Sequence, residues 1–246
     1  KNGLDTDAIR DAAGPYDFPN LLIQYVRHEP PAGLNTGWWR GVGHMQNAIP
    51  VESFIDELAR ATGQDAVAFR KPLLAKHPRG LKVLEVAAEK AGWGKPLPKG
   101  WGRGVAVTLA FRTYAAQVVE VSVDADGNVK TERVVTVVDC GQVVSPPTLE
   151  AQVQGGIVFG LSAALFGNIT IKNGRVEQSN FHDYRLLRMS EMPVIETHVI
   201  PSKEDPTGIG EIATVVITPA VLNAVFDATG KRIRKLPIDP ATLKSA

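Results

Sequence analysis

The stretch GVAVTLAFRTYAAQVVEVSVDADGNVKTERVVTVV, residues 104–138, decides the fold class of this chain. Apolar and polar residues alternate along much of it with a period of two, which is typical of strands whose successive side chains point to opposite faces of a sheet. The pattern predicts strands over residues 105–111, 116–123 and 129–138, and a tight turn at Asp124–Gly127. We therefore expect a sheet of antiparallel strands in the middle of the chain.

The sequence before this sheet combines loops with helices. Turn-forming prolines and glycines fill residues 1–47, in which only Leu21–Val26 suggests a strand. A helix is expected next, with Pro50 in its first turn and its end at Gly63. Its apolar face has the spacing i, i+3, i+4, i+7 and i+8, formed by Val51, Phe54, Ile55, Leu58 and Ala59.

Two shorter helices should follow. One starts near Asp65 and is interrupted by Pro72, and the other covers residues 79–91 and is closed by Gly92. Residues 92–102, with two prolines and two tryptophans, are expected to link these helices to the sheet.

The sequence after the sheet predicts a buried helix over residues 148–166 and a strand over 192–200. Between them, the Asn173-Gly174 pair favours a type I′ hairpin turn. A last helix is expected from Thr218 as its cap, with Pro219 in the first turn, to Gly230. Because helices and hairpins occur in blocks and not in strict βαβ alternation, the fold class expected is α+β.

The composition excludes several classes of protein. The 246 residues carry a formal net charge of +1, which gives no electrostatic reason to expect nucleic acid as a partner. No apolar run reaches the roughly 20 residues that a transmembrane helix needs. The one cysteine allows no internal disulfide, and it cannot ligate an iron–sulfur cluster, which usually needs four thiolates. The first residue is Lys1, from which we expect a processed or cut piece of a longer protein.

The first candidate site is the segment Trp38–His44, in which Arg40 and Gly41 follow two tryptophans. A glycine-rich turn beside an arginine lets backbone amides approach an anionic ligand closely. The alternative is that both tryptophans are core anchors and Arg40 is a structural ion-pair partner. Composition alone favours this alternative, because buried aromatic residues are common and anion sites are rare.

Two more loops could contribute to chemistry. Gln152, at the start of the apolar helix, can offer a donor and an acceptor to a heteroaromatic ring, although it could equally satisfy the helix terminus. Glu211 follows Gly208-Ile209-Gly210 and precedes an apolar run, so a pocket of low dielectric would suit it to work as a general base. A glutamate in a turn is more often simply exposed, and spacing alone leaves the choice open.

A nucleophile is a third possibility, with Cys140 attacking and His182 as its base in an acyl-transfer enzyme. A lone cysteine at a strand end is far more often a small buried hydrophobic residue. The five histidines show no ligand-pair spacing such as His-x-x-x-His, so we expect no metal held by side chains of this chain.

The order of these loops resembles the xanthine dehydrogenase/aldehyde oxidase family. The resemblance begins at Trp39–Gly43 and continues through Asn47, Val51–Ala59, Val138–Gly141, Gln152–Leu161, Phe181–Met192, Gly208–Glu211 and Thr218–Pro237. It is strongest to the beta subunit of isoquinoline 1-oxidoreductase and to related bacterial aldehyde dehydrogenases, and it covers nearly the whole chain in order.

The resemblance implies the C-terminal portion of the molybdenum-cofactor-binding domain of a molybdenum hydroxylase, which oxidises an aldehyde or an N-heteroaromatic substrate with water as the oxygen source. By motif, Glu211 is the catalytic general base, and Arg40, Gly41, Gln152 and Gly210 bind the cofactor. The family holds molybdenum through molybdopterin, often as its cytosine dinucleotide, and not through side chains.

The same resemblance implies that this chain works with partners. Residues 1–103, with the arginine loop, and residues 104–246, with the glutamine helix and the Glu211 loop, would both be parts of one molybdopterin-binding region. The upstream part of the molybdenum subunit would complete the cofactor site, and a separate [2Fe–2S] subunit would take the electrons, with a cytochrome c or flavin subunit as a further acceptor. The resemblance favours the bacterial periplasm over the cytoplasm and is compatible with either substrate class.

One departure from the family pattern supports a competing hypothesis. The family commonly places proline and a small residue after the catalytic Gly-Glu, whereas here Ile212 and Ala213 follow Glu211. Together with the missing upstream loops, this departure supports a non-catalytic scaffold or interaction domain that retains the fold.

Overall fold

The computed structural model describes residues 3–244. Its centre is a four-stranded sheet in the order β1-β2-β3-β6, formed by β1 (Trp101–Ala110), β2 (Thr113–Val123), β3 (Val129–Asp139) and β6 (Val194–Val199). The first three strands are antiparallel neighbours, and β6 pairs with β3 in parallel. The three strands expected from residues 104–138 are therefore confirmed, and the mixed α+β class with them.

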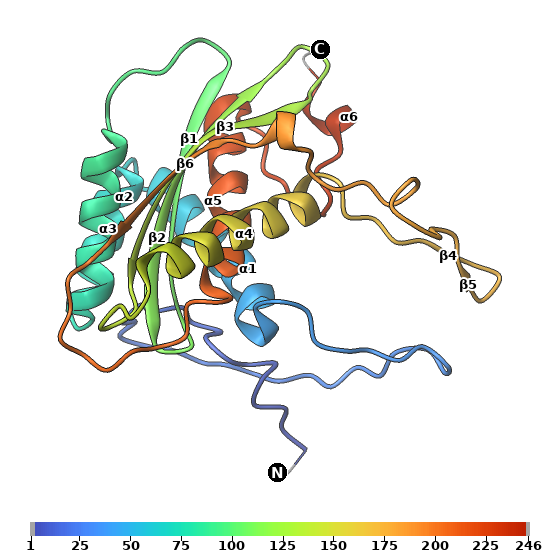
Figure 1. Cartoon of the computed structure of the whole chain (residues 1–246), viewed down its shortest axis with the longest axis horizontal. Helices are drawn as coiled ribbons and strands as arrows, with labels where there is room; N and C mark the ends of the chain where they lie inside the picture. Colours follow the sequence, from blue (N-terminus) through green and yellow to red (C-terminus); the bar gives the residue numbers. More distant parts are fainter. Residues whose placement is uncertain (1–2, 245–246) are drawn as a thin grey trace.

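Helices cover both faces of this sheet (Figure 1). On one face lie α2 (Ala66–Leu73) and α3 (Pro78–Ala91), and on the other lie α4 (Pro146–Leu165) and α5 (Ile212–Thr229). Helix α1 (Val42–Ala61) packs against α5, and the short α6 (Pro240–Leu243) ends the described chain. The core is accordingly divided into two apolar clusters, one on each side of the strands.

Helix α5 is the hub of the larger cluster. Residues 212–225 of α5 are all buried, and its length and composition would allow a membrane span. The helix instead lies along β1 and β2. This close approach requires glycine: a Cβ atom on Gly104 would lie 2.2 Å from the backbone nitrogen of Ala224 and 2.3 Å from the carbonyl oxygen of Ala220. The backbone of α5 thus lies directly on the backbone of β1.

Side chains from α1 and α5 satisfy the outer edge of β1. The Glu52 carboxylate accepts the Val107 N–H at 3.2 Å, the Asn223 amide donates to the Val105 carbonyl at 3.1 Å, and Asp227 accepts the Arg103 N–H at 2.9 Å. These are the groups that a further strand would otherwise bind.

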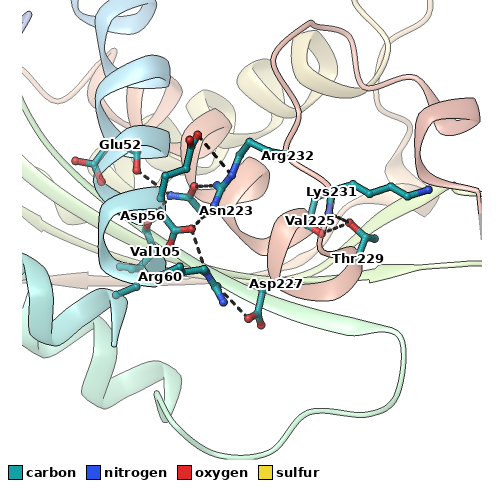
Figure 2. Close-up of polar contacts among 12 residues, drawn as sticks. Glu52, Asp56, Arg60, Val105, Asn223, Val225, Asp227, Thr229, Lys231 and Arg232 are labelled. Carbon is teal, nitrogen blue, oxygen red and sulfur yellow. Dashed lines mark hydrogen bonds and ion pairs between the residues drawn. The ribbon is translucent and has the colours of Figure 1, made fainter. Parts of the chain in front are cut away.

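A polar network joins α1 to α5 and to the segment after it (Figure 2). Buried Asp56 accepts from Arg232 at 2.8 Å and from Arg60 at 3.2 Å, and Arg232 also donates to the side-chain oxygen of Asn223 at 2.9 Å. The Asp56 carboxylate is thereby paired twice inside the protein, as a buried charge requires.

Two extended segments leave this compact body, and we call them the arms. Arm 1, residues 19–39, has no helix or strand. Arm 2, residues 167–191, contains the small hairpin of β4 (Ile171–Lys172) and β5 (Arg175–Val176) and the short 3₁₀ helix η1 (Met189–Glu191). In Figure 1 both arms project on the side of α1 and α4, away from α2 and α3.

Three sequence expectations are wrong. The strand at Leu21–Val26 is absent, because no strand among residues 3–244 lies beside this part of arm 1. Helices α1 and α5 begin at Val42 and Ile212, before Pro50 and Thr218, so both prolines lie inside helices. Phe54, expected on the buried face of α1, is 57% exposed.

The energies explain the early start of α5. Burying each large apolar side chain is worth about 1.5–3 kcal/mol, so the buried residues before Pro219 together outweigh the roughly 3 kcal/mol cost of an interior proline. In α1, Pro50 is exposed, as is Gln46, whose carbonyl group loses its helical donor and remains open to water.

Candidate functional site

All five residues expected at the site lie in one cluster. The Arg40 guanidinium donates to the Gly210 carbonyl, at 2.8 Å from Nε and also through Nη2. The same Nη2 reaches the side-chain oxygen of Gln152 at 3.1 Å and its carbonyl at 3.4 Å. The Gly41 N–H donates to Oε1 of Glu211 at 3.3 Å. Three segments that are about 60 to 110 residues apart therefore meet through their polar atoms.

Packing of α4 on α5 brings Gln152 close to Gly210, the residue before Glu211. The two helices touch where α4 carries glycine: a Cβ on Gly160 would lie 2.3 Å from Cγ2 of Ile217, and one on Gly156 would lie 3.0 Å from Cβ of Ala213. The Thr214 hydroxyl donates to the Gly156 carbonyl at 3.0 Å. Gln152 lies one turn before Gly156 on α4, which places it beside the N-terminus of α5.

The loop before Glu211 is fixed to the turn between β1 and β2. The Thr113 hydroxyl donates to the Gly208 carbonyl at 2.7 Å, and the Gly208 N–H donates to the Phe111 carbonyl at 3.2 Å. A side chain at Gly208 would not fit, because its Cβ would lie 2.8 Å from that of Phe111. This attachment fixes where the chain enters α5, and with it the position of Glu211.

Glu211 is half-buried, and within residues 3–244 it takes part in no ion pair. The neighbouring Arg40 donates its hydrogen bonds to Gly210 and Gln152. The carboxylate is thus oriented by one backbone N–H and keeps acceptor capacity for another group. A general base needs a carboxylate oxygen that is available to accept a proton, and a permanent salt bridge would occupy that oxygen.

Two helix N-termini meet at the cluster. Gly41 is the N-cap of α1 and has no side chain with which to cap it. Glu211 is the N-cap of α5, and its side chain makes no capping hydrogen bond within the part of the chain that the structure describes. The partial positive charge of a helix N-terminus favours oxygen-rich or anionic groups, and Arg40 adds a full charge beside them. Among the described residues, no three His, Cys, Asp or Glu side chains gather to hold a metal ion. The cluster thus fits an anionic cofactor that brings its own metal ligands.

An aromatic pair beside the cluster was missed from the sequence. The rings of Trp39 and Phe159 lie 4.7 Å apart, and the Arg40 guanidinium lies 5.8 Å from the Phe159 ring centre. Both rings are about two-fifths exposed. The spacing could have shown it, because Phe159 follows Gln152 by seven positions and lies on the same helix face.

The structure does not bring Cys140 and His182 together as a nucleophile and base. Cys140 is 4% exposed within the larger core cluster, and burial raises the pKa of its thiol. The His182 side chain is 74% exposed on arm 2, where its nearest charged partner is Asp183 at 3.5 Å. A buried thiol with a raised pKa is a poor nucleophile, so the acyl-transfer hypothesis has no structural support.

Comparison with known proteins identifies related sequences and folds. Residues 82–193 match the family described as "Molybdopterin cofactor-binding domain". The chain is 36% identical to isoquinoline 1-oxidoreductase subunit beta of Brevundimonas diminuta, over 92% of this chain and 29% of that protein. It is 35% identical to the membrane-bound aldehyde dehydrogenase [pyrroloquinoline-quinone] of Gluconacetobacter polyoxogenes, over 98% of this chain and 34% of that protein.

The fold agrees with a solved structure. Quinoline 2-oxidoreductase from Pseudomonas putida 86 superimposes with a TM-score of 0.73 over 83% of this chain and 52% of that one, at 13% identity, which shows a shared fold. The chain spans about a third of the length of the two curated relatives.

Proposed function

This chain belongs to the xanthine dehydrogenase/aldehyde oxidoreductase family and contains part of its molybdopterin cofactor-binding domain, and from this premise we propose that it supplies the general base, Glu211, of a molybdenum hydroxylase. The observation that carries the proposal is the cluster itself. A half-buried glutamate, which forms no ion pair with any residue from 3 to 244, is held by the Gly41 N–H between two helix N-termini. The substrate class is an aldehyde or an N-heteroaromatic compound, as the names of the relatives suggest.

Each residue of the cluster has a separate task in this proposal. The bound molybdopterin group would supply the redox chemistry at an electron-poor carbon. The carboxylate of Glu211 accepts a proton from the water-derived oxygen. Arg40 holds the Gly210 carbonyl, and with it the backbone that enters α5. Gln152 keeps its amide nitrogen available to the cofactor, since within residues 3–244 that nitrogen donates to no protein group.

The proposal includes partners. The chain corresponds to about a third of the length of the two relatives, so the upstream part of the molybdenum subunit would complete the cofactor site. These 246 residues contain one cysteine and cannot ligate an iron–sulfur cluster by themselves, and a [2Fe–2S] subunit is the proposed acceptor of the electrons.

Metal analysis of the complex purified with its upstream partner provides the first test. We expect molybdenum in a stoichiometric amount. A complex that contains pyrroloquinoline quinone and no molybdenum, as the name of one relative suggests, would overturn the proposal. So would a metal-free complex from cells that synthesise molybdopterin, and this result would favour the scaffold hypothesis.

The second test is Glu211→Gln, with Glu204→Gln as its matched control. Glu204 is an exposed glutamate of the same loop. Loss of a general base costs about 10²–10⁴-fold in turnover, so Glu211→Gln should reduce kcat by at least this factor at unchanged molybdenum content. Glu204→Gln should retain full activity. Equal activities of the two variants would exclude Glu211 as the base.

A further inference from the structure

The loop that contacts Glu211 has an unfavourable backbone conformation. Gly41 has φ 102° and Val42 has φ 49°, and both values lie in the left-handed region. Glycine adopts such angles readily, but a β-branched residue does so only where surrounding contacts enforce it. Because the Gly41 N–H is the group that orients Glu211, whatever holds Val42 also holds the carboxylate.

Residues 7–14 contact the first two turns of α1, immediately after these two residues. The Asn47 amide donates to the carbonyl of Ala8 at 2.9 Å and to that of Arg10 at 2.8 Å. His44 is buried, and its Nδ1 pairs with the Asp11 carboxylate. These side chains lie one and two turns into α1, so they fix the start of the helix immediately after the strained residues.

Backbone packing shows how closely this segment approaches the loop. A Cβ atom on Gly43 would lie 1.6 Å from the carbonyl oxygen of Asp7. Real Cβ atoms do not approach an oxygen so closely, and the obstacle is backbone, which cannot rotate away. The contact therefore requires glycine at position 43 and leaves residues 7–14 little freedom relative to α1.

His44 also contacts the element that fixes the other side of the site. Its ring lies 4.8 Å from that of Phe111, measured between ring centres. The Phe111 carbonyl accepts the Gly208 N–H in the loop that leads to Glu211. One histidine thus lies between the segment that fixes the Arg40 loop and the turn that fixes the Glu211 loop.

We infer that residues 7–14 form a clamp that holds the Arg40–Val42 loop in its strained conformation, with His44 and Asn47 as positioning residues for the hydrogen bond from Gly41 to Glu211. The consequence for turnover rests on the proposed function of Glu211, whereas the consequence for the loop does not.

The test compares His44→Phe and Asn47→Ala with His77→Phe in the assembled complex. His44→Phe keeps an aromatic ring against Phe111 and removes the contact with Asp11. His77 is a matched control because it also binds a side-chain oxygen, that of Tyr114, and lies near its ring, but it precedes α3 on the other face of the sheet.

Hydrogen–deuterium exchange of residues 38–47 is the first readout. Loss of one or two hydrogen bonds should make exchange about 5- to 30-fold faster in this segment, with no change in β2 and β3. His77→Phe should leave residues 38–47 unchanged. Unchanged exchange in both clamp variants, or equally faster exchange throughout the sheet, would overturn the clamp.

Turnover is the second readout. Misplacement of a catalytic group by about 1 Å can cost up to 10²-fold, so kcat should fall by about 10- to 100-fold while KM and molybdenum content remain near the parent values. Asn47→Asp has the same size but no amide donor, and it should behave like Asn47→Ala. Parent kcat in a variant with faster loop exchange would overturn the positioning role.

The two proposals fail in different ways. If Glu211→Gln remains active while His44→Phe still loosens residues 38–47, the general-base assignment is wrong and the clamp stands. If Glu211→Gln is inactive and the clamp variants change neither exchange nor kcat, the base stands and the clamp is wrong.

Discussion

Helix α5 and the arms use apolar residues in opposite ways. In α5, residues 212–225 are buried against the sheet and the neighbouring helices. In the arms, large apolar side chains face outward: Leu22 is 80% exposed, Val26 85%, Phe181 73% and Met189 84%. Proteins rarely leave so many apolar side chains exposed without a function. The body thus buries its apolar side chains in its own core, whereas the arms leave theirs uncovered by the described residues.

The largest difference in stability should appear when a glycine is replaced in each region, beside α5 and in arm 1. Gly104→Val would insert Cβ and methyl groups where the α5 backbone lies 2.2 Å from the Cβ position, so we expect a loss of about 4 kcal/mol or more in the free energy of unfolding. Gly37→Ala in arm 1 meets no atom within 4 Å and should change stability little. Chemical denaturation of both variants measures the contrast, and equal midpoints would contradict it.

A smaller contrast exists within α4. Gly160→Ala would bring Cβ to 2.3 Å from Ile217, and overpacking of this kind costs about 1–3 kcal/mol. Gly155→Ala meets open space on the same helix and should stabilise the protein by about 0.5–1 kcal/mol, because alanine is the better helix former. Thermal unfolding should therefore shift in opposite directions for the two variants. A shift in the same direction would show that α4 does not lie on α5 as described.

Polar substitution on an arm should have a smaller effect still. Leu22→Ser removes an apolar side chain that is already exposed, so the free energy of unfolding of this chain should stay within about 0.5 kcal/mol of the parent value. The same substitution should weaken co-purification with the upstream part of the subunit. A large loss of stability would mean that arm 1 is packed on the body.

The smallest expected effect is the pH dependence of one turn in arm 2. In arm 2, hydrogen bonds from the backbone N–H groups of Asn180 and Ser179 lower the pKa of Asp183 to about 2. Because the folded pKa lies below the unfolded one, this turn gains its stabilisation above the unfolded value and loses it as the pH falls through about 2. NMR titration of the Asp183 carboxyl group should give this midpoint, and Ser179→Pro, which removes one N–H donor, should raise it.

The sequence predicted elements whose signals are local. The hairpin at Asn173-Gly174 has positive φ at both residues, 52° and 74°, as its Asn-Gly pair indicated. Gly92 closes α3 with φ 66° in the same manner. In both cases the residue itself determines the backbone conformation, so no distant contact is needed to predict it.

Predictions failed where a distant contact overrode a local signal. Proline normally marks the start of a helix, but Pro219 lies seven residues inside α5 because burial on the sheet outweighs its cost. Leu21–Val26 has the composition of a strand and no partner strand. Residue spacing did not reveal the role of Asn47 in the clamp, since its partners Ala8 and Arg10 are backbone carbonyls almost forty positions away.

The candidate site lies between these cases. Taken singly, Arg40, Gln152 and Glu211 were more easily explained as structural or exposed residues, and only the order of the loops pointed to one site. In the structure Arg40 donates to Gln152 and to Gly210, and the Gly41 N–H donates to Glu211. The family pattern has proline after the glutamate; here Ile212 takes the first helical position, and α5 still begins there.

The covered edge of β1 affects how this chain behaves when its partners are absent. Sheets from different molecules aggregate by pairing their free edges, and on this edge the Val105 carbonyl and the N–H groups of Arg103 and Val107 are already bound within the chain. Amyloid-like stacking through β1 is therefore blocked. When the chain is produced alone, loss of solubility should therefore begin at the exposed apolar side chains of the arms and not at β1. Polar substitutions in the arms should be a more effective remedy than changes to β1.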